Sequence, residues 1–131
     1  MRLDLGLLLL RVMSAGTMLL AHGLGKAMSF SGMAATFPDP LGMGGRMSLV
    51  MAIFAEVFCS FLVLIGLSTR LATIPLIGTM LTAFFIVHAA DPWNVRELAY
   101  MYGMAFAVIF FTGPGSLSID GLVKLKKMSR P

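Results

Sequence analysis

The sequence predicts an all-α protein: an integral membrane four-helix bundle with a short C-terminal amphipathic helix. Of the 131 residues, 58% are hydrophobic and only 12% are charged, and the mean hydropathy is +0.91. Soluble domains carry about 25% charged residues, so this chain could not cover its surface in water. The apolar content excludes intrinsic disorder, and the single cysteine excludes a disulfide scaffold. The length suits one domain over residues 1–131.

Four apolar stretches approach the length of about 20 residues that a helix needs to cross the hydrocarbon of a bilayer. We expect the four spans at about residues 5–25, 47–67, 71–89 and 98–112. Pro75 falls in the first turn of the third span, where a helix tolerates proline. The fourth span is short and ends at the Gly-Pro-Gly of residues 113–115, a strong helix breaker.

The connections between these spans differ in length and chemistry. Residues 68–70 form a tight hairpin between the second and third spans, and residues 91–97 join the third to the fourth. Arg70 in the hairpin and Trp93 in the second connection are expected at the membrane–water interface, where aromatic belts form. Residues 27–46 form a long loop rich in glycine and proline, and the sequence indicates no role for it.

The distribution of basic residues predicts the orientation, because cytoplasmic segments carry an excess of lysine and arginine. An even number of spans places both termini on one side, with six basic residues: Arg2, Arg70, Lys124, Lys126, Lys127 and Arg130. The other side holds Lys26, Arg46 and Arg96. We therefore expect both termini in the cytoplasm and the 27–46 loop outside. Arg11 interrupts the first apolar stretch, which argues against a cleaved signal peptide.

After the breaker, the chain is expected to form a short amphipathic helix on the cytoplasmic leaflet. Ser116 or Ser118 can cap the helix, and Asp120 favours its N-terminal turn. The apolar and the basic side chains that follow fall on different faces. A frayed, charged tail is the alternative interpretation.

Ionisable residues inside the spans are the candidate functional site, because a charge at the bilayer centre costs about 2.5–3.5 kcal/mol on insertion scales. The chain has Arg11, His22, Glu56 and His88 within spans and Lys26 at a span end. Such residues should face the bundle interior and one another.

The rise of 1.5 Å per residue predicts how these groups are layered. Counted from the cytoplasmic edge, Arg11 lies at roughly 10 Å, Glu56 at roughly 18 Å, His88 at roughly 25 Å and His22 at roughly 27 Å. The expectation is a polar column through the bundle, with Arg11 paired to Glu56 and Lys26 too high to reach it. The alternatives are an Arg11 that snorkels to phosphates, a protonated Glu56 and interfacial histidines.

Several classes of chemistry lack their motifs. The chain has no CxxC pair, no dinucleotide or P-loop glycine fingerprint, and no basic patch with interleaved aromatics for nucleic acid. No metal site is expected, since the spacing of Met33, Met43 and Met47 near the outer loop matches none. His22 and His88 share a level and could ligate haem, but no small-residue pattern opens space for it, so haem is not expected.

Several motifs in one order carry a family resemblance. They are the Leu8–Arg11 run, Ala21-His22-Gly23-Leu24-Gly25-Lys26, Ala55-Glu56, Leu64-Ile65-Gly66-Leu67-Ser68-Thr69-Arg70, His88, and Gly113-Pro114-Gly115-Ser116-Leu117-Ser118-Ile119-Asp120. Across nearly the whole chain this resembles the DoxX family of small bacterial membrane proteins. The HGxxK and GxxTR elements together make the resemblance specific. The matching positions are Arg11, His22, Gly23, Lys26, Glu56, Arg70 and His88.

The resemblance implies a four-helix protein of the bacterial inner membrane with a role in redox chemistry. The first hypothesis is a component of a redox complex that binds quinone at the polar site, flanked by aromatics such as Phe84, Phe85, Tyr100 and Tyr102. The expected partner is a soluble redox enzyme or another membrane subunit, or a second copy of the chain. The alternatives are a non-catalytic scaffold or chaperone and a small proton-coupled transporter. The resemblance transfers no catalytic mechanism.

Overall fold

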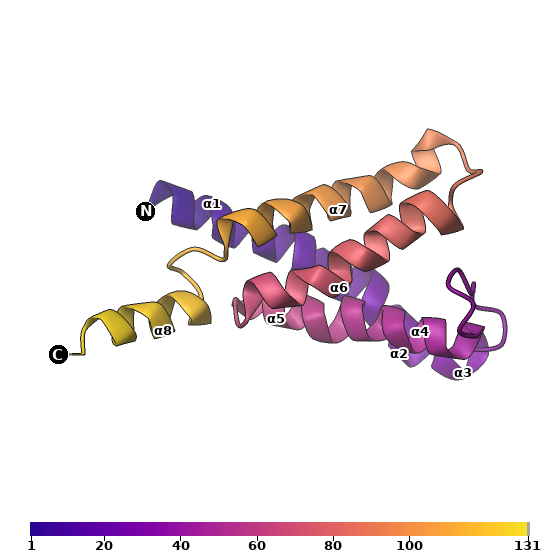
Figure 1. Cartoon of the computed structure of the whole chain (residues 1–131), viewed down its shortest axis with the longest axis horizontal. Coiled ribbons are helices and arrows are strands. Elements are labelled where there is room, and N and C mark those ends of the chain that lie inside the picture. Colours follow the sequence, from indigo (N-terminus) through magenta and orange to yellow (C-terminus); the bar gives the residue numbers. More distant parts are fainter. Residues whose placement is uncertain (131) are drawn as a thin grey trace.

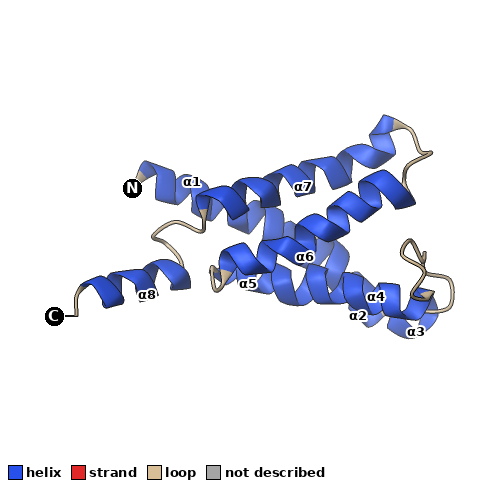
Figure 2. Ribbon diagram, in the orientation of Figure 1, coloured by secondary structure: helices blue, strands red, loops and turns tan. Residues whose placement is uncertain are grey.

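The computed structural model describes residues 1–130 as four long helices, a looped connection and a short terminal helix (Figure 1). Each long helix is long and apolar enough to cross a membrane. The four helices run over Arg2–Met28, Gly45–Ile65, Thr69–Val87 and Trp93–Thr112. Figure 2 shows only helices and loops over the described residues. The predicted all-α bundle of four spanning helices is confirmed.

The spans divide into shorter elements, because three of them change their helical hydrogen-bonding pattern along their length. The first span comprises α1 (Arg2–Arg11), π-helical segments Val12–Gly16 and Met18–Gly23, and α2 (Leu24–Met28). The second comprises α4 (Gly45–Ile53), the π-helical Phe54–Cys59 and α5 (Ser60–Ile65). The third comprises α6 (Thr69–Thr82) and the π-helical Ala83–Val87. The remaining elements are α3 (Phe30–Met33), α7 (Trp93–Thr112) and α8 (Ile119–Met128).

The fourth span is longer than the sequence indicated. Helix α7 begins at Trp93, whereas the sequence predicts that residues 91–97 connect the third and fourth spans. The guanidinium of Arg96 donates to the backbone carbonyl of Phe84 and lies 4.1 Å from the centre of the Phe84 ring. This cation–π contact accommodates a charge in the first turn of the helix.

Buried side chains from all four spans form one core between the helices. The largest fully buried apolar members are Met18, Val63, Leu76, Phe106 and Ile109. The outward faces carry exposed large apolar residues, such as Leu71 at 70% and Phe111 at 78% exposure. An apolar exterior around a packed interior suits a lipid environment.

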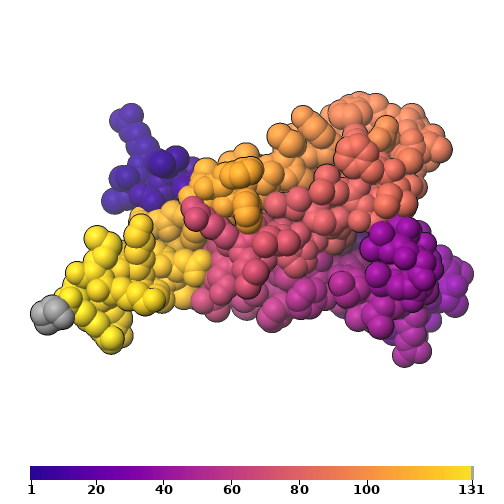
Figure 3. Space-filling model, viewed as in Figure 1, coloured from indigo at the N-terminus to yellow at the C-terminus, as the bar shows by residue number. Residues whose placement is uncertain are grey.

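Both chain termini lie at one end of the bundle, and the 34–44 loop lies at the other (Figure 1). Helix α8 starts beside the α5–α6 turn and, as Figure 3 shows, extends past the end of the bundle. Ser118 caps α8, since its hydroxyl oxygen accepts a 3.0 Å hydrogen bond from the Gly121 N–H. The expected serine cap is therefore confirmed at Ser118.

Candidate functional site

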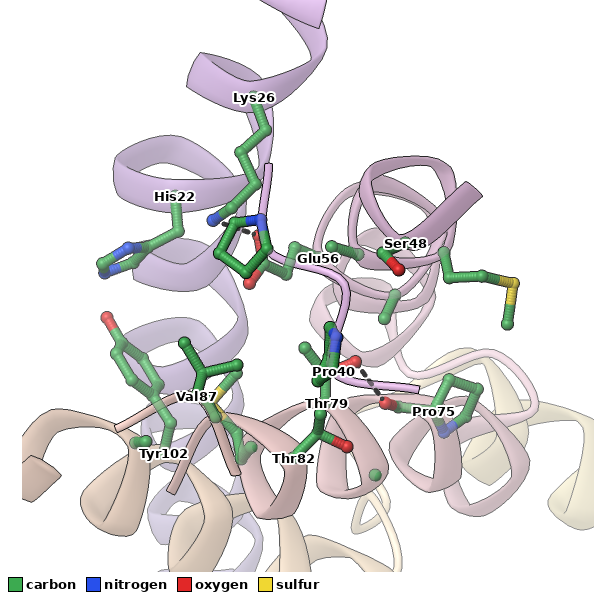
Figure 4. A pocket seen from close by; sticks show the side chains of 18 of the residues that line it. His22, Lys26, Pro40, Ser48, Glu56, Pro75, Thr79, Thr82, Val87 and Tyr102 are labelled. Atoms are coloured by element: carbon green, nitrogen blue, oxygen red, sulfur yellow. Dashed lines mark hydrogen bonds and ion pairs between the residues drawn. The ribbon is translucent and has the colours of Figure 1, made fainter. Parts of the chain in front are cut away.

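A cavity of about 540 Å3 occupies the loop end of the bundle. Its wall includes four of the five predicted site residues, namely His22, Lys26, Glu56 and His88. Figure 4 shows side chains of the first two spans facing those of α6 and α7 across it. Arg11 does not line this cavity, so the predicted polar column divides into two separate sites.

The buried carboxylate in this cavity is paired with lysine and not with arginine. Lys26 Nζ lies 2.7 Å from Glu56 Oε2, with side-chain exposures of 22% and 6%. The contact is an ion pair that joins the first span to the second. The predicted Arg11–Glu56 pair is wrong. Lys26 reaches Glu56 because its long aliphatic stem carries the ammonium down from the helix end.

The two spans that carry this pair approach each other closely at Gly23. A Cβ at this position would overlap the backbone carbonyl of Glu56, so only glycine permits the approach. Gly23 lies in the π-helical segment Met18–Gly23, and Glu56 lies in the π-helical segment Phe54–Cys59. Single π turns inside α-helices occur frequently at functional sites. The glycine of the HGxxK element thus has a packing role that places Lys26 against Glu56.

His22 faces an aromatic partner on the fourth span. The rings of His22 and Tyr102 meet edge to face with their centres 5.5 Å apart, and both residues line the cavity. In Figure 4 the hydroxyl end of Tyr102 points towards His22. Sequence reasoning named Tyr102 only as one of several flanking aromatics. Its burial beside Phe106 on the core face of α7 is what distinguishes it from the exposed Tyr100.

His88 lies at the rim of the cavity, at the end of the third span. Its Nδ1 is 2.7 Å from Asp91 Oδ2, and both side chains are more than a third exposed. His88 and His22 line the same cavity, but His88 is engaged by this neighbouring carboxylate in the turn.

The 34–44 loop contributes to the wall of the cavity through Phe37, Pro38, Pro40, Leu41 and Met43. Asp39 holds the loop in this position, because its carboxylate accepts hydrogen bonds from the backbone N–H groups of Met43 and Gly44, each at 2.9 Å. The Ser48 hydroxyl donates a third, at 3.1 Å. These bonds, led by that from Gly44, hold the pKa of Asp39 below its ordinary value. The loop therefore belongs to the site, which the sequence did not indicate.

Arg11 instead closes the opposite end of the bundle. It is 1% exposed and donates hydrogen bonds to the backbone carbonyls of Val63 and Leu64, at 3.5 and 3.3 Å, and of Leu117. The guanidinium fits because Gly66, with φ of +74°, has no Cβ in its path. Arg11 thus ties the C-terminal segment to the end of the second span and does not snorkel to lipid phosphates.

Asp120 completes this second site. Its carboxylate accepts hydrogen bonds from the N–H groups of Ser68 and Thr69 and from the Thr69 hydroxyl, at 2.9, 2.9 and 2.8 Å. Burial raises the pKa of Asp120, but these hydrogen bonds and the nearby Arg11 charge outweigh it and hold the pKa below its ordinary value. Asp120 therefore caps the N-terminus of α6 from a distant part of the chain.

The two residues predicted at the interface lie at opposite ends of the bundle. Arg70 is exposed in the first turn of α6 and donates a 3.3 Å hydrogen bond to the Phe111 carbonyl. Trp93 is 54% exposed at the start of α7, with its ring near those of Phe84 and Tyr100. Neither residue lines the cavity.

Comparison with known proteins shows the family. The DoxX family model matches residues 6–89. Similar proteins include an uncharacterized protein of Haemophilus influenzae, 30% identical over 110 residues that cover 79% of this chain and 80% of that protein. The uncharacterized membrane protein Rv3486 of Mycobacterium tuberculosis is 30% identical over 80% of this chain and 74% of its own. The inner membrane protein YqjF of Escherichia coli is 28% identical over 94% and 95%. No solved structure matches the chain. The chain is a membrane protein that belongs to the DoxX family.

Proposed function

We propose that this protein is a small inner-membrane component of a redox complex and that its cavity binds the head group of a quinone. The observation that carries the proposal is the convergence of His22, Tyr102 and the Lys26–Glu56 pair on one largely apolar cavity. Sites for small molecules have this composition, with a few placed polar groups in apolar walls and volumes of about 300–1,000 Å3.

The polar groups match the hydrogen-bonding needs of a quinone. Each quinone oxygen accepts hydrogen bonds, and the Lys26 ammonium, the His22 imidazole and the Tyr102 hydroxyl are donors. The reduced form carries hydroxyl groups, and these can donate hydrogen bonds to the Glu56 carboxylate. A cavity that offers both donors and an acceptor therefore suits both redox forms of the ring.

Apolar side chains at the cavity rim suit a ligand that arrives from the membrane. Met51, Phe54 and Leu98 line the cavity and are each about half exposed on the lipid-facing side of their spans. The loop fixed by Asp39 forms part of the cavity wall. A quinone would enter between spans, with its hydrocarbon tail remaining among the lipid chains.

The redox partner in this proposal is a soluble enzyme or another membrane subunit. Reduction of a quinone takes two electrons and two protons, and the single Cys59 gives this chain no dithiol to supply them. The partner would exchange the electrons, while cavity groups hold and release the protons. We place the protein in the bacterial inner membrane with both termini in the cytoplasm, as the basic residues indicate.

Quinone binding tests the proposal directly. The protein would be purified from quinone-replete membranes, and bound quinone extracted and quantified per protein. Tyr102→Phe and His22→Ala should each lower the affinity about fivefold or more, the effect of losing one hydrogen bond of about 1 kcal/mol. Tyr100→Phe is the matched control, because Tyr100 lies on the same helix but outside the cavity.

Wild-type protein without bound quinone, and without a titratable quinone site, would contradict this function. A scaffold would instead crosslink to a partner and keep its function in Glu56→Gln. A transporter would show proton-coupled flux of a solute in proteoliposomes. Each outcome assigns the chain to a different class of membrane protein.

A further inference from the structure

A second cavity, of about 770 Å3, lies at the end of the bundle that holds both termini. It is formed by the start of α6, the end of α7 and the 113–116 segment, together with one side of α8. Its wall combines two cations with apolar side chains: Arg70, Lys124, Leu71, Leu125 and Met128. Nothing in the proposed quinone site uses these residues.

The charges in this cavity are available to an anion. Arg70 and Lys124 are both exposed, and within residues 1–130 neither pairs with a carboxylate. Arg70 is steadied by its hydrogen bond to the Phe111 carbonyl. Among the described residues, Asp120 is the only acid in the wall, and its oxygens are engaged by Ser68 and Thr69. Asp4 lies beside the wall, where its carboxylate accepts a hydrogen bond from the Ser116 N–H. Both carboxylates are thus bonded to N–H and hydroxyl donors of the chain, and Arg70 and Lys124 are the charged groups left to bind an anion.

Helix α8 presents one mixed face to this cavity. Lys124, Leu125 and Met128 fall within about 100° of one another around the helix, and all three line the cavity. The two apolar side chains are 56% and 73% exposed, and no residue of α8 is buried. A helix that carries basic and exposed apolar side chains is typical of the interface between hydrocarbon and headgroups.

The position of the cavity identifies the anion. The 66–68 turn ends the second span and starts the third, so it marks the level at which the hydrocarbon ends. Asp120 fixes the start of α8 to this turn. Phospholipid phosphates lie at the same level, next to the exposed side chain of Leu71. We propose that this cavity binds the headgroup phosphate of an anionic phospholipid through Arg70 and Lys124, with an acyl chain against Leu71, Leu125 and Met128.

Lipid titration of the purified protein tests the inference. Binding would be followed by native mass spectrometry and by the melting temperature in detergent, with phosphatidylglycerol and phosphatidylcholine as probes. A basic residue near an anionic surface contributes roughly fivefold in affinity, so Arg70→Gln with Lys124→Gln should weaken phosphatidylglycerol binding about 30-fold. The matched control is Arg2→Gln with Lys126→Gln, which removes the same charge at the same end without touching the cavity. The control should bind as the wild type does.

Three results would overturn the inference. If both double variants lost phosphatidylglycerol binding equally, the net charge of the protein and not this cavity would determine lipid binding. Both lipids carry a phosphate but only phosphatidylglycerol has a net negative charge, so equal binding of the two by the wild type would remove the selectivity for an anionic lipid. Competition by inorganic phosphate at the concentration at which the lipid binds would show a site for a free anion. Leu125→Gln supplies an independent check, because it should weaken phosphatidylglycerol binding while both cations remain.

Discussion

The ammonium of Lys26 on the first span lies 2.7 Å from the carboxylate of Glu56 on the second, inside a cavity of the bundle. The two partners differ in their access to solvent, because Glu56 is 6% exposed and Lys26 is 22% exposed. Loss of Lys26 therefore leaves the Glu56 carboxylate buried without a partner and away from water. Loss of Glu56 leaves the Lys26 ammonium, whose flexible stem lets it turn toward water.

The difference in exposure between Glu56 and Lys26 predicts that substitutions of the two residues have non-additive effects on thermal unfolding. Lys26→Met should destabilise the protein by up to about 3–5 kcal/mol, and Glu56→Gln by less, while the double variant recovers much of the loss. Melting temperatures in detergent for the four proteins form the double-mutant cycle. The matched cycle of Arg11→Met with Glu56→Gln should be additive. Additivity in the Lys26 cycle would mean that the pair contributes nothing to stability.

Gly23 predicts a steric effect at the contact between the first two spans. Gly23→Ala places a methyl group against the Glu56 carbonyl, which should cost about 1–3 kcal/mol, as overpacking does. Gly25→Ala is the control, since no atom lies within 4 Å of the place that its methyl group would take, and it should stabilise the helix by up to about 1 kcal/mol. The two melting temperatures should move in opposite directions; a Gly23→Ala protein as stable as the control would refute the close approach.

Asp120 predicts a dependence of stability on acid. Its folded-state pKa lies below the ordinary value, so its contribution is fully present above about pH 3.9, the unfolded value. The contribution is lost as the pH falls from there through the folded pKa. Asp120→Asn removes the charge and one of the two accepting oxygens, so it should cost about 1.5–3 kcal/mol near neutral pH, as the loss of a hydrogen bond to a charged group does.

The measurement is the difference in melting temperature between wild type and Asp120→Asn from pH 7 down to pH 3. That difference should be constant at first and shrink below about pH 4. Asp39 titrates in the same range with a lowered pKa, but it is present in both proteins and cancels. If the difference in melting temperature does not change with pH, the substitution acts through the shape of the side chain and not through the loss of its charge.

Arg11 predicts a loosened C-terminal segment when its guanidinium is removed. Arg11→Gln loses charged hydrogen bonds to Val63, Leu64 and Leu117, each typically contributing about 1.5–3 kcal/mol. We expect a lower melting temperature and faster proteolysis within residues 113–120. Arg2→Gln, an exposed arginine on the same helix, should change neither. Unchanged protease resistance in Arg11→Gln would contradict the role assigned to this residue.

The proposed orientation in the membrane predicts where a reporter protein fused to the chain will be active. Both termini lie at one end, and from the six-to-three distribution of basic residues we propose that this end faces the cytoplasm. A reporter that is active only in the cytoplasm should be active when fused after the last residue, and inactive when inserted in the 34–44 loop. The reverse pattern would invert the topology.

Helix number and approximate span positions follow from composition, but the pairing of polar groups does not. Arg11 and His22 are eleven residues apart on the first span, which is roughly 16 Å along a helix. Each therefore meets what packs against the span at its own level, and those partners come from distant parts of the chain. Arg11 meets Val63, Leu64 and Leu117, whereas His22 meets Tyr102.

Other features depend on contacts that no local pattern encodes. The loop that lines part of the cavity is fixed by Asp39, whose partners are set by how the chain turns between the first two spans. The closeness of Lys26 to Glu56 rests on a helix contact that only Gly23 permits. The HGxxK element contained both Gly23 and Lys26, but its meaning is visible only with the second span in place.

The cap that Asp120 supplies to α6 has a consequence for biosynthesis. The ribosome makes Thr69 long before Asp120, so the third span must enter the membrane with the first N–H groups of α6 still bound to water. Only when the segment after the fourth span emerges can its carboxylate replace that water and can Arg11 bond to the Leu117 carbonyl. The four helices would thus be inserted first and joined afterwards by residues that follow the fourth span.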